Sequence, residues 1–203
     1  MSVSLPMRQS IATKVPVDSE DVDSDLVVQA QHDLRAFALL YGRYIDPVHQ
    51  YCYRRLGTRE AAEDATSQVF IQALAGLPKF TSRGGSFRGW LFTIAHNVVI
   101  DQYRAARPSE WLDTGMEVPD HSPSPEELAL AADTGRTLRE AVVQLPERQR
   151  QVVELRLAGL TAAEIGQVLG CRARTVDVAQ FRAVAKLRTL LGVTVQPEGA
   201  RDA

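Results

Sequence analysis

Residues 160–188 read LTAAEIGQVLGCRARTVDVAQFRAVAKLR, and this stretch decides the fold of the C-terminal part of the chain. Thr161 is a favourable helix N-cap, and Gly170 can adopt the left-handed conformation that ends a helix. Gly166 leaves room for two helices to cross. The positions that such a crossing buries carry small or aliphatic side chains, namely Ile165, Leu169, Cys171 and Val176. A plain helical hairpin would not need both glycines in this register, so the stretch predicts a helix-turn-helix.

The second helix of this unit presents a mixed surface. In this register its exposed positions are Arg172, Arg174, Thr175, Asp177, Val178, Phe181, Arg182 and Lys186, with Arg188 further along. Arginines near a helix start can contact phosphates or guanine edges, and apolar side chains can pack against a thymine methyl group. The Asp177 carboxylate would be repelled by a phosphate but can accept a hydrogen bond from a cytosine amino group. Five basic residues give a salt slope of only about −4 to −5, so we expect this unit to bind DNA weakly by itself.

Charge is distributed unevenly along the 203-residue chain, whose net charge is −2. Residues 34–108 carry 10 basic and 5 acidic side chains, residues 136–191 carry the same numbers, and residues 109–135 carry no basic and 7 acidic ones. Two basic modules separated by an acidic strip are typical of a protein in which two blocks contact an anionic partner. Ordinary variation of surface charge is the alternative.

Other classes of protein are disfavoured. No apolar run approaches the roughly 18 residues that a membrane span requires, and the N-terminus lacks the apolar core of a signal peptide, so we expect a cytoplasmic protein without membrane contact of its own. Cys52 and Cys171 have no partner at a metal-binding spacing, so we expect neither a metal nor a cofactor. No phosphate-binding loop or nucleophile–base pair is recognisable, so we expect no enzyme activity.

Helical periodicity recurs through the chain without strand-like alternation, which predicts an all-α protein. A first helix is expected after a cap at residues 23–25, with Leu34 on its apolar stripe, and a separate short helix is expected to start at Pro47 and end at Gly57. A fourth helix follows the cap Thr58. The residues that it turns toward the core are expected to be Val69, Phe70, Ala73, Leu74 and Leu77.

A glycine-rich loop over residues 79–86 and a helix over residues 87–104 complete this module, which ends at Pro108. Residues 109–125 combine prolines and carboxylates, as an extended linker does. We therefore predict two small helical domains, 24–107 and 126–191, joined by a flexible acidic linker over 108–125. A disordered tail is expected at 1–23 and a further tail at 192–203.

Several blocks, taken in order, resemble the extracytoplasmic-function (ECF) sigma factors, the small two-domain promoter-recognition subunits of bacterial RNA polymerase. The blocks are DLRAFALLYGRY, YCYRRLGTREAAEDATSQVF, SFRGWLFTIAHNVVIDQYR, LPERQRQVVELRLAGLTAAEIGQVLG and TVDVAQFRAVAKLR. The resemblance covers residues 24–190. It implies a region 2-like bundle followed by a region 4-like helix-turn-helix, and a function in promoter-specific initiation on core RNA polymerase.

The resemblance also implies which residues bind the polymerase. The polar face of the fourth helix would dock on the clamp helices of the largest subunit, through Glu63, Asp64, Ser67, Gln68 and Gln72. Ser67 stands where the family usually has glutamine, and Gln68 stands where it usually has glutamate. A polar helix face of this kind is also found on ordinary solvated helices.

The resemblance also implies which residues bind the two promoter elements. The minus-ten element would be melted and held by Phe80, Arg83, Ser86, Phe87, Arg88, His96, Asn97 and Arg104. Opening a duplex requires new partners for unstacked bases, which aromatic and basic side chains provide. His96 replaces a usual arginine and would contact phosphate only when protonated; Trp90 is expected in the core instead.

The helix-turn-helix would read the minus-thirty-five element, with Asp177 in place of a common lysine. Tethering to polymerase would raise its effective concentration. The family is often inhibited by anti-sigma factors, so we expect such a partner here. A polymerase-independent helix-turn-helix regulator, whose N-terminal helices sense a ligand or dimerise, is the alternative function.

Overall fold

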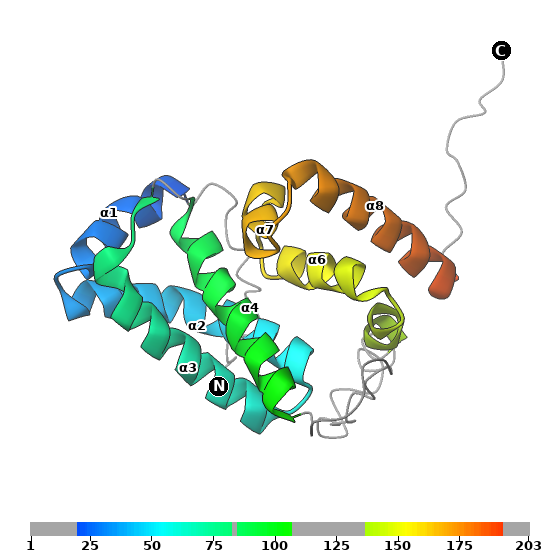
Figure 1. The fold of residues 1–203 in the computed structure, drawn as a ribbon, viewed down its shortest axis with the longest axis horizontal. Helices are drawn as coiled ribbons and strands as arrows, with labels where there is room; N and C mark the ends of the chain where they lie inside the picture. Colours follow the sequence, from blue (N-terminus) through cyan, green and yellow to red (C-terminus); the bar gives the residue numbers. More distant parts are fainter. Residues whose placement is uncertain (1–19, 83–84, 107–136, 193–203) are drawn as a thin grey trace, which may run out of the picture.

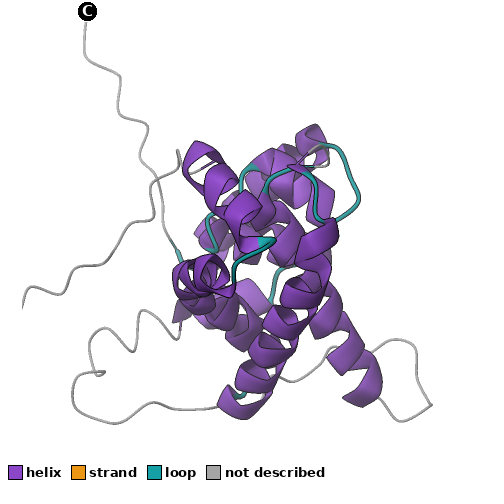
Figure 2. Cartoon of the chain, turned by 90° about the vertical axis from the view of Figure 1, so that its left-hand side faces the viewer, coloured by secondary structure: helices purple, strands orange, loops and turns teal. Residues whose placement is uncertain are grey.

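The computed structural model describes residues 20–82, 85–106 and 137–192, and the regular structure in these residues is helical throughout (Figures 1 and 2). The described residues contain no strand, which confirms the predicted all-α class. Of the helices described, none combines the length and apolar character needed to cross a bilayer. The predicted linker at 108–125 lies outside the described residues, as do residues 1–19 of the predicted tail at 1–23 and residues 193–203 of the predicted tail at 192–203. Residues 20–23, which were predicted to be disordered, are helical.

The N-terminal module is a bundle of α1 (Glu20–Ala30), α2 (Leu34–Leu56), α3 (Arg59–Gly76) and α4 (Phe87–Ala106), with the short 3₁₀ turn η1 (Leu77–Lys79) between the last two. The bundle occupies the left half of Figure 1. Large side chains from three of the helices are fully buried in its centre, namely Leu40, Val48, Tyr51, Val69, Leu91, Phe92 and Val99. This core places α3 and α4 so that each keeps one face in solvent.

Helix α2 differs from the sequence prediction at its start and at Pro47. Asp33 caps it by accepting a hydrogen bond from the Arg35 backbone N–H at 2.8 Å, so Leu34 begins α2 and does not belong to the first helix. The helix then runs through Pro47, where a new helix was predicted. Buried residues on both sides of the proline lie on one stripe, and their packing favours one continuous helix over a break. The predicted end at Gly57 is confirmed by its φ of 79°.

Helix α3 has the predicted cap, because Thr58 accepts a hydrogen bond from the Ala61 N–H at 3.2 Å. Four of the five predicted core residues are buried, and the prediction for Leu74 is wrong: its side chain is 40% exposed. The buried stripe passes through Val69, Ala73 and Leu77, and Leu74 lies at its solvent edge. The outer face of α3 is therefore partly apolar.

The C-terminal module contains α6 (Glu147–Leu157), α7 (Ala162–Val168) and α8 (Ala173–Leu190), preceded by helical residues 137–143. The predicted helix-turn-helix is present in α7 and α8. Thr161 forms a full capping box with Glu164, Gly170 has a φ of 63°, and Ile165 is fully buried. A Cβ on Gly166 would lie 2.6 Å from the carbonyl oxygen of Cys171, so the crossing does require glycine.

The two modules pack directly against each other. Helix α7 lies against α4, and α6 contacts α2 (Figure 1). The buried apolar residues of both modules form one continuous cluster. The surfaces predicted to contact DNA and polymerase therefore lie on one packed body.

Candidate nucleic-acid interface

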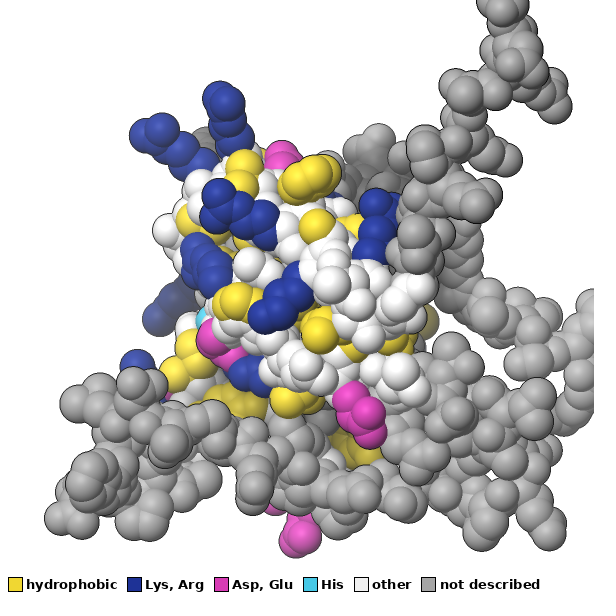
Figure 3. Space-filling model, turned by 90° about the vertical axis from the view of Figure 1, so that its right-hand side faces the viewer, with side chains coloured by type: hydrophobic (Ala, Val, Ile, Leu, Met, Phe, Trp, Pro, Cys, Tyr) yellow, Lys and Arg dark blue, Asp and Glu magenta, His cyan; other side chains and the backbone are white. Residues whose placement is uncertain are grey.

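Helix α8 is held by its inner side and offers its outer side to solvent. Val176 and Ala183 are buried beneath it and are 1% and 0% exposed. All the residues predicted to read the minus-thirty-five element are exposed on it, namely Arg172, Arg174, Thr175, Asp177, Val178, Phe181, Arg182 and Lys186. Basic side chains gather on this side of the molecule with apolar ones between them (Figure 3). Such a surface suits phosphate contacts combined with apolar contacts to bases.

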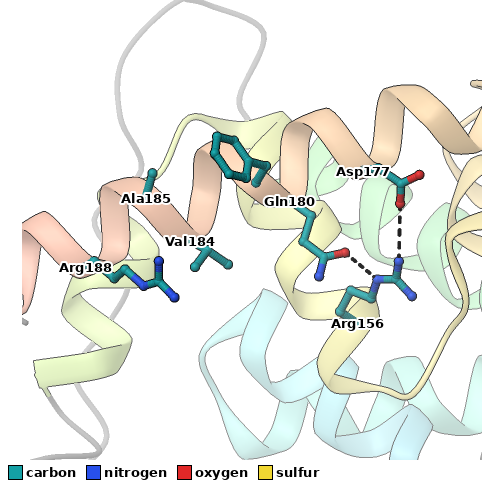
Figure 4. A pocket seen from close by; sticks show the side chains of 7 residues that line it. Arg156, Asp177, Gln180, Val184, Ala185 and Arg188 are labelled. Atoms are coloured by element: carbon teal, nitrogen blue, oxygen red, sulfur yellow. Dashed lines mark hydrogen bonds and ion pairs between the residues drawn. The ribbon is translucent and has the colours of Figure 1, made fainter. Parts of the chain in front are cut away.

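The Asp177 carboxylate points toward α6 (Figure 4). It lies 3.7 Å from the guanidinium of Arg156, which also donates to Gln180 at 2.7 Å and to the Leu160 carbonyl at 3.0 Å. Arg156, Asp177 and Gln180 border an open hollow of about 500 Å³ between α6 and α8. Asp177 thus partly neutralises a cation, and this reduces the repulsion that a bare carboxylate would exert on DNA. The sequence did not predict the role of Arg156, because residues 156 and 177 come together only when α6 and α8 pack in the folded protein.

The residues predicted to hold the minus-ten element are divided between surface and interior. Asn97 and Arg104 are exposed on α4, with Arg104 3.5 Å from the Asp101 carboxylate. Phe80 is half-buried after η1, and Arg83 lies outside the described residues. The outer face of α4 is thus available to a polyanion.

Phe87 differs from the prediction because it is a core residue, only 5% exposed. Its ring packs against Phe80, Trp90 and Tyr44, with centroids 5.9, 5.6 and 5.5 Å away. Trp90 is half-buried in the same cluster, in agreement with its predicted core role. Phe87 therefore fixes the start of α4, and Phe80 and Trp90 are the half-buried members of this cluster.

Arg88 and Ser86 also differ from the prediction, because both bind a carboxylate of the other module. Arg88 is 8% exposed and donates two hydrogen bonds to Glu164, from Nε at 3.0 Å and from Nη2 at 2.9 Å, while the Ser86 hydroxyl donates to the same carboxylate. Burial disfavours the charged form of Glu164, but these hydrogen bonds outweigh it and hold the pKa of Glu164 below its usual value. In this arrangement neither residue is available to a phosphate.

His96 also differs from the prediction, because the residue is only 7% exposed. Its Nδ1 lies 3.1 Å from the Tyr51 hydroxyl. Burial, followed by the charge of Arg55 and weakly that of Arg148, lowers the pKa of His96, and Glu147 opposes them. The imidazole is therefore neutral near pH 7 and cannot replace an arginine as a phosphate ligand.

The outer face of α3 presents all five residues that were predicted to bind polymerase, namely Glu63, Asp64, Ser67, Gln68 and Gln72. Glu63 is paired with Arg59 at 2.7 Å, and the Ser67 hydroxyl donates to the Glu63 carbonyl at 3.0 Å. Ile71 and Leu74 add apolar area to this face, being 63% and 40% exposed. A polar surface with apolar side chains in its midst is typical of a protein-binding site.

Comparison with known proteins covers both modules. The family model "Sigma-70 region 2" matches residues 40–108, and the model "Sigma-70, region 4" matches residues 135–187. The ECF RNA polymerase sigma factor BldN of Streptomyces coelicolor is 37% identical over 181 residues, which are 87% of this chain and 67% of that protein. ShbA of Streptomyces griseus, also an ECF sigma factor, is 37% identical over 80% of this chain and 87% of its own length. The chain belongs to the ECF sigma factor family.

A solved structure with a similar fold supports the architecture. The structure of CnrH in complex with the cytosolic domain of CnrY is similar over 88% of this chain and all of that one, with a TM-score of 0.64 and 25% identity. The predicted fold, a region 2 bundle and a region 4 helix-turn-helix, is confirmed. Members of this family are initiation factors and not enzymes.

This ECF sigma factor has a second charged contact between its modules that sequence reasoning missed. Arg55 of α2 is 6% exposed and binds two carboxylates of α6, Glu154 at 3.1 Å and Glu147 at 2.7 Å. Its guanidinium carbon also lies 5.5 Å from the centre of the Tyr103 ring. Burial disfavours the cation, but the two carboxylates outweigh it and raise the pKa of Arg55. No local sequence signal predicts this contact, because Arg55 and Glu154 are 99 residues apart.

Proposed function

We propose that this chain binds core RNA polymerase and directs promoter-specific transcription initiation. The observation that carries the proposal is the occurrence of both sigma regions in one chain, in order, with the region 4 match ending in an exposed basic helix. A helix-turn-helix with so few basic residues binds DNA weakly, and a tethering partner raises its effective concentration. We place the activity in the cytoplasm, where transcription takes place.

We assign three contact surfaces to this function. The face of α3 around Asp64 and Ile71 docks on the clamp helices of the polymerase. The outer face of α4 around Asn97 and Arg104 holds the minus-ten element, and the outer face of α8 reads the minus-thirty-five element. Domain boundaries at 24–107 and 126–191 divide these surfaces between the two regions.

In-vitro transcription tests this function. Purified core polymerase is incubated with the chain and a library of genomic promoter fragments, and the transcripts are sequenced. Transcripts that start at a shared motif only when both proteins are present support an initiation factor. A polymerase-independent regulator, the alternative function, would instead footprint a defined duplex without polymerase and start no transcripts.

We also propose that a protein inhibitor binds this chain. CnrH, a protein with the same architecture, is held in complex with the cytosolic domain of CnrY. The exposed apolar side chains Ile71, Leu157 and Phe181 lie on both modules and would be covered by such a partner. Affinity capture of the tagged chain from its own cells, with and without polymerase depletion, tests this: recovery of polymerase without any stoichiometric second protein contradicts it.

A further inference from the structure

The guanidinium of Arg156 is held where α6 and α8 meet (Figure 4). Its Nε donates to the Gln180 amide oxygen at 2.7 Å, and its Nη1 donates to the Leu160 carbonyl at 3.0 Å. Its Nη2 lies 3.7 Å from Oδ1 of Asp177. Each nitrogen of this planar group thus faces an acceptor of the protein, so the orientation of the group relative to α8 is fixed.

The contact between Arg156 and Asp177 is an ion pair and not a hydrogen bond, because 3.7 Å exceeds the usual donor–acceptor range. Both side chains reach solvent, since that of Asp177 is 61% exposed and that of Arg156 is 32% exposed. The cation therefore orients the Asp177 carboxylate without using up its capacity to accept hydrogen bonds. The pair presents an acceptor whose charge is locally balanced.

Asp177 occupies a position from which a recognition helix reads bases. It lies in the second turn of α8, and the N-terminal residues of such a helix contact base edges in the major groove. Arg174 and Phe181 lie about one turn before and after it, and both are exposed on the same face. Asp177 is the one acidic residue of α8, so its carboxylate interrupts a face that otherwise attracts phosphate.

The donor pattern of the major groove decides which base suits this carboxylate. A carboxylate only accepts hydrogen bonds, so guanine and thymine, which present acceptors and no donor there, offer it no partner. The adenine amino group lies between two acceptors, its own N7 and the O4 of the paired thymine, and both would repel the carboxylate. The cytosine amino group has an acceptor on one side only, the O6 of the paired guanine. A C·G pair is therefore the most favourable partner for Asp177.

We propose that Asp177 is a specificity-determining residue, which selects a cytosine at one position of the minus-thirty-five element, and that Arg156 is the positioning residue that holds its carboxylate at the base edge. The inference rests on the proposed function, since it concerns the surface of α8 assigned there. It adds a base preference that is specific to this chain, because a lysine at this position would favour guanine.

Two positions separate the reading residue from the positioning residue. Asp177→Asn keeps the size of the side chain, but an amide pairs best with adenine, so the preference should move from cytosine toward adenine. Arg156→Gln removes the cation, whereas Arg156→Lys keeps the charge and loses the fork that holds several acceptors. Glu140→Gln and Arg148→Lys are the matched controls, because both positions are exposed in the same module and neither lines the hollow between α6 and α8.

Transcription with core polymerase measures the base preference directly. The full-length chain and core polymerase are incubated with promoters whose minus-thirty-five element is randomised, and the transcribed templates are sequenced. For wild type and both controls, we expect one position at which cytosine exceeds every other base by about 5-fold or more. Asp177→Asn should remove this excess and leave the other positions unchanged. The absence of a cytosine-preferring position in wild type, or its persistence in Asp177→Asn, would overturn the base-reading role.

The same library tests the positioning residue. Arg156→Gln should reduce the cytosine excess by about 3-fold or more, Arg156→Lys should reduce it less, and neither should alter the preference further once Asp177→Asn is present. An arginine with a merely structural role would lower transcription from all templates equally, and this result would overturn the positioning role. Arg156→Lys decides the question if circular dichroism shows that Arg156→Gln has lost its helices.

Failure of wild type to start any transcript would refute the proposed function itself. Selection of duplexes from the same library by an excess of the chain at low salt, without polymerase, then decides the base preference, because weak binding to DNA is strongest at low ionic strength. A selected pool without the cytosine position would overturn the inference independently of transcription.

Discussion

Replacing Gly166 by alanine tests the helix crossing with a single methyl group. The added Cβ would lie 2.6 Å from the carbonyl oxygen of Cys171 and 3.4 Å from the backbone nitrogen of Ala173. Both neighbours are backbone atoms of the turn, so no side-chain rotation relieves the clash. Overpacking of this kind costs about 1–3 kcal/mol, whereas the better helix propensity of alanine returns up to about 1 kcal/mol. We expect a net loss of about 1–2 kcal/mol in the free energy of unfolding.

Gly42→Ala is the matched control for this change. Gly42 lies inside α2, and an added Cβ would have no heavy atom within 4 Å apart from its chain neighbours and the backbone of its own helix. Only the propensity gain remains, so we expect this variant to be more stable by about 0.5–1 kcal/mol. Urea unfolding followed by circular dichroism measures both values, and each 1 kcal/mol corresponds to about 2–4 °C in Tm. A Gly166→Ala protein as stable as wild type would show that the crossing is looser than described.

Three further outcomes are expected. Stability should fall as the pH drops below about 6.5, because the lowered pKa of His96 means that the unfolded chain takes up the proton first; urea unfolding measures this, and a slope that survives in His96→Gln would contradict it. Asp177→Lys should make the salt slope for duplex binding more negative by about 1, measured by anisotropy across a KCl series; an unchanged slope would place residue 177 away from DNA. Cys52 should resist alkylation in the native protein, because burial raises the pKa of its thiol to about 11, and mass spectrometry would detect modification at Cys171 first; equal labelling would show that α2 opens readily.

Local chemistry predicted much of this fold. Thr58, Thr161, Gly57 and Gly170 end or begin helices as expected, since a cap or a left-handed residue acts within one turn of its own position. Pro47 misled the prediction because tertiary packing outweighed its local preference. Tertiary packing of this kind cannot be predicted from a short window of sequence.

The candidate sites were predictable only where they face solvent. The faces of α3 and α8 follow from helical periodicity, and every residue assigned to them is exposed. The burial of Arg88 and His96 did not follow, because it depends on α6 and α7, more than 40 residues further along the chain. Periodicity identifies the apolar side of a helix but not the charged group that a distant helix brings to its polar side.

The shared carboxylate of Glu164 links two positions that are 76 residues apart. A mutation that removes the cation at residue 88 would strand that carboxylate, and a mutation that removes the carboxylate would strand the cation. Over evolutionary time the two positions should consequently change in concert. Among descendants of this sequence, an arginine lost at the start of α4 should be accompanied by an uncharged residue in the first turn of α7.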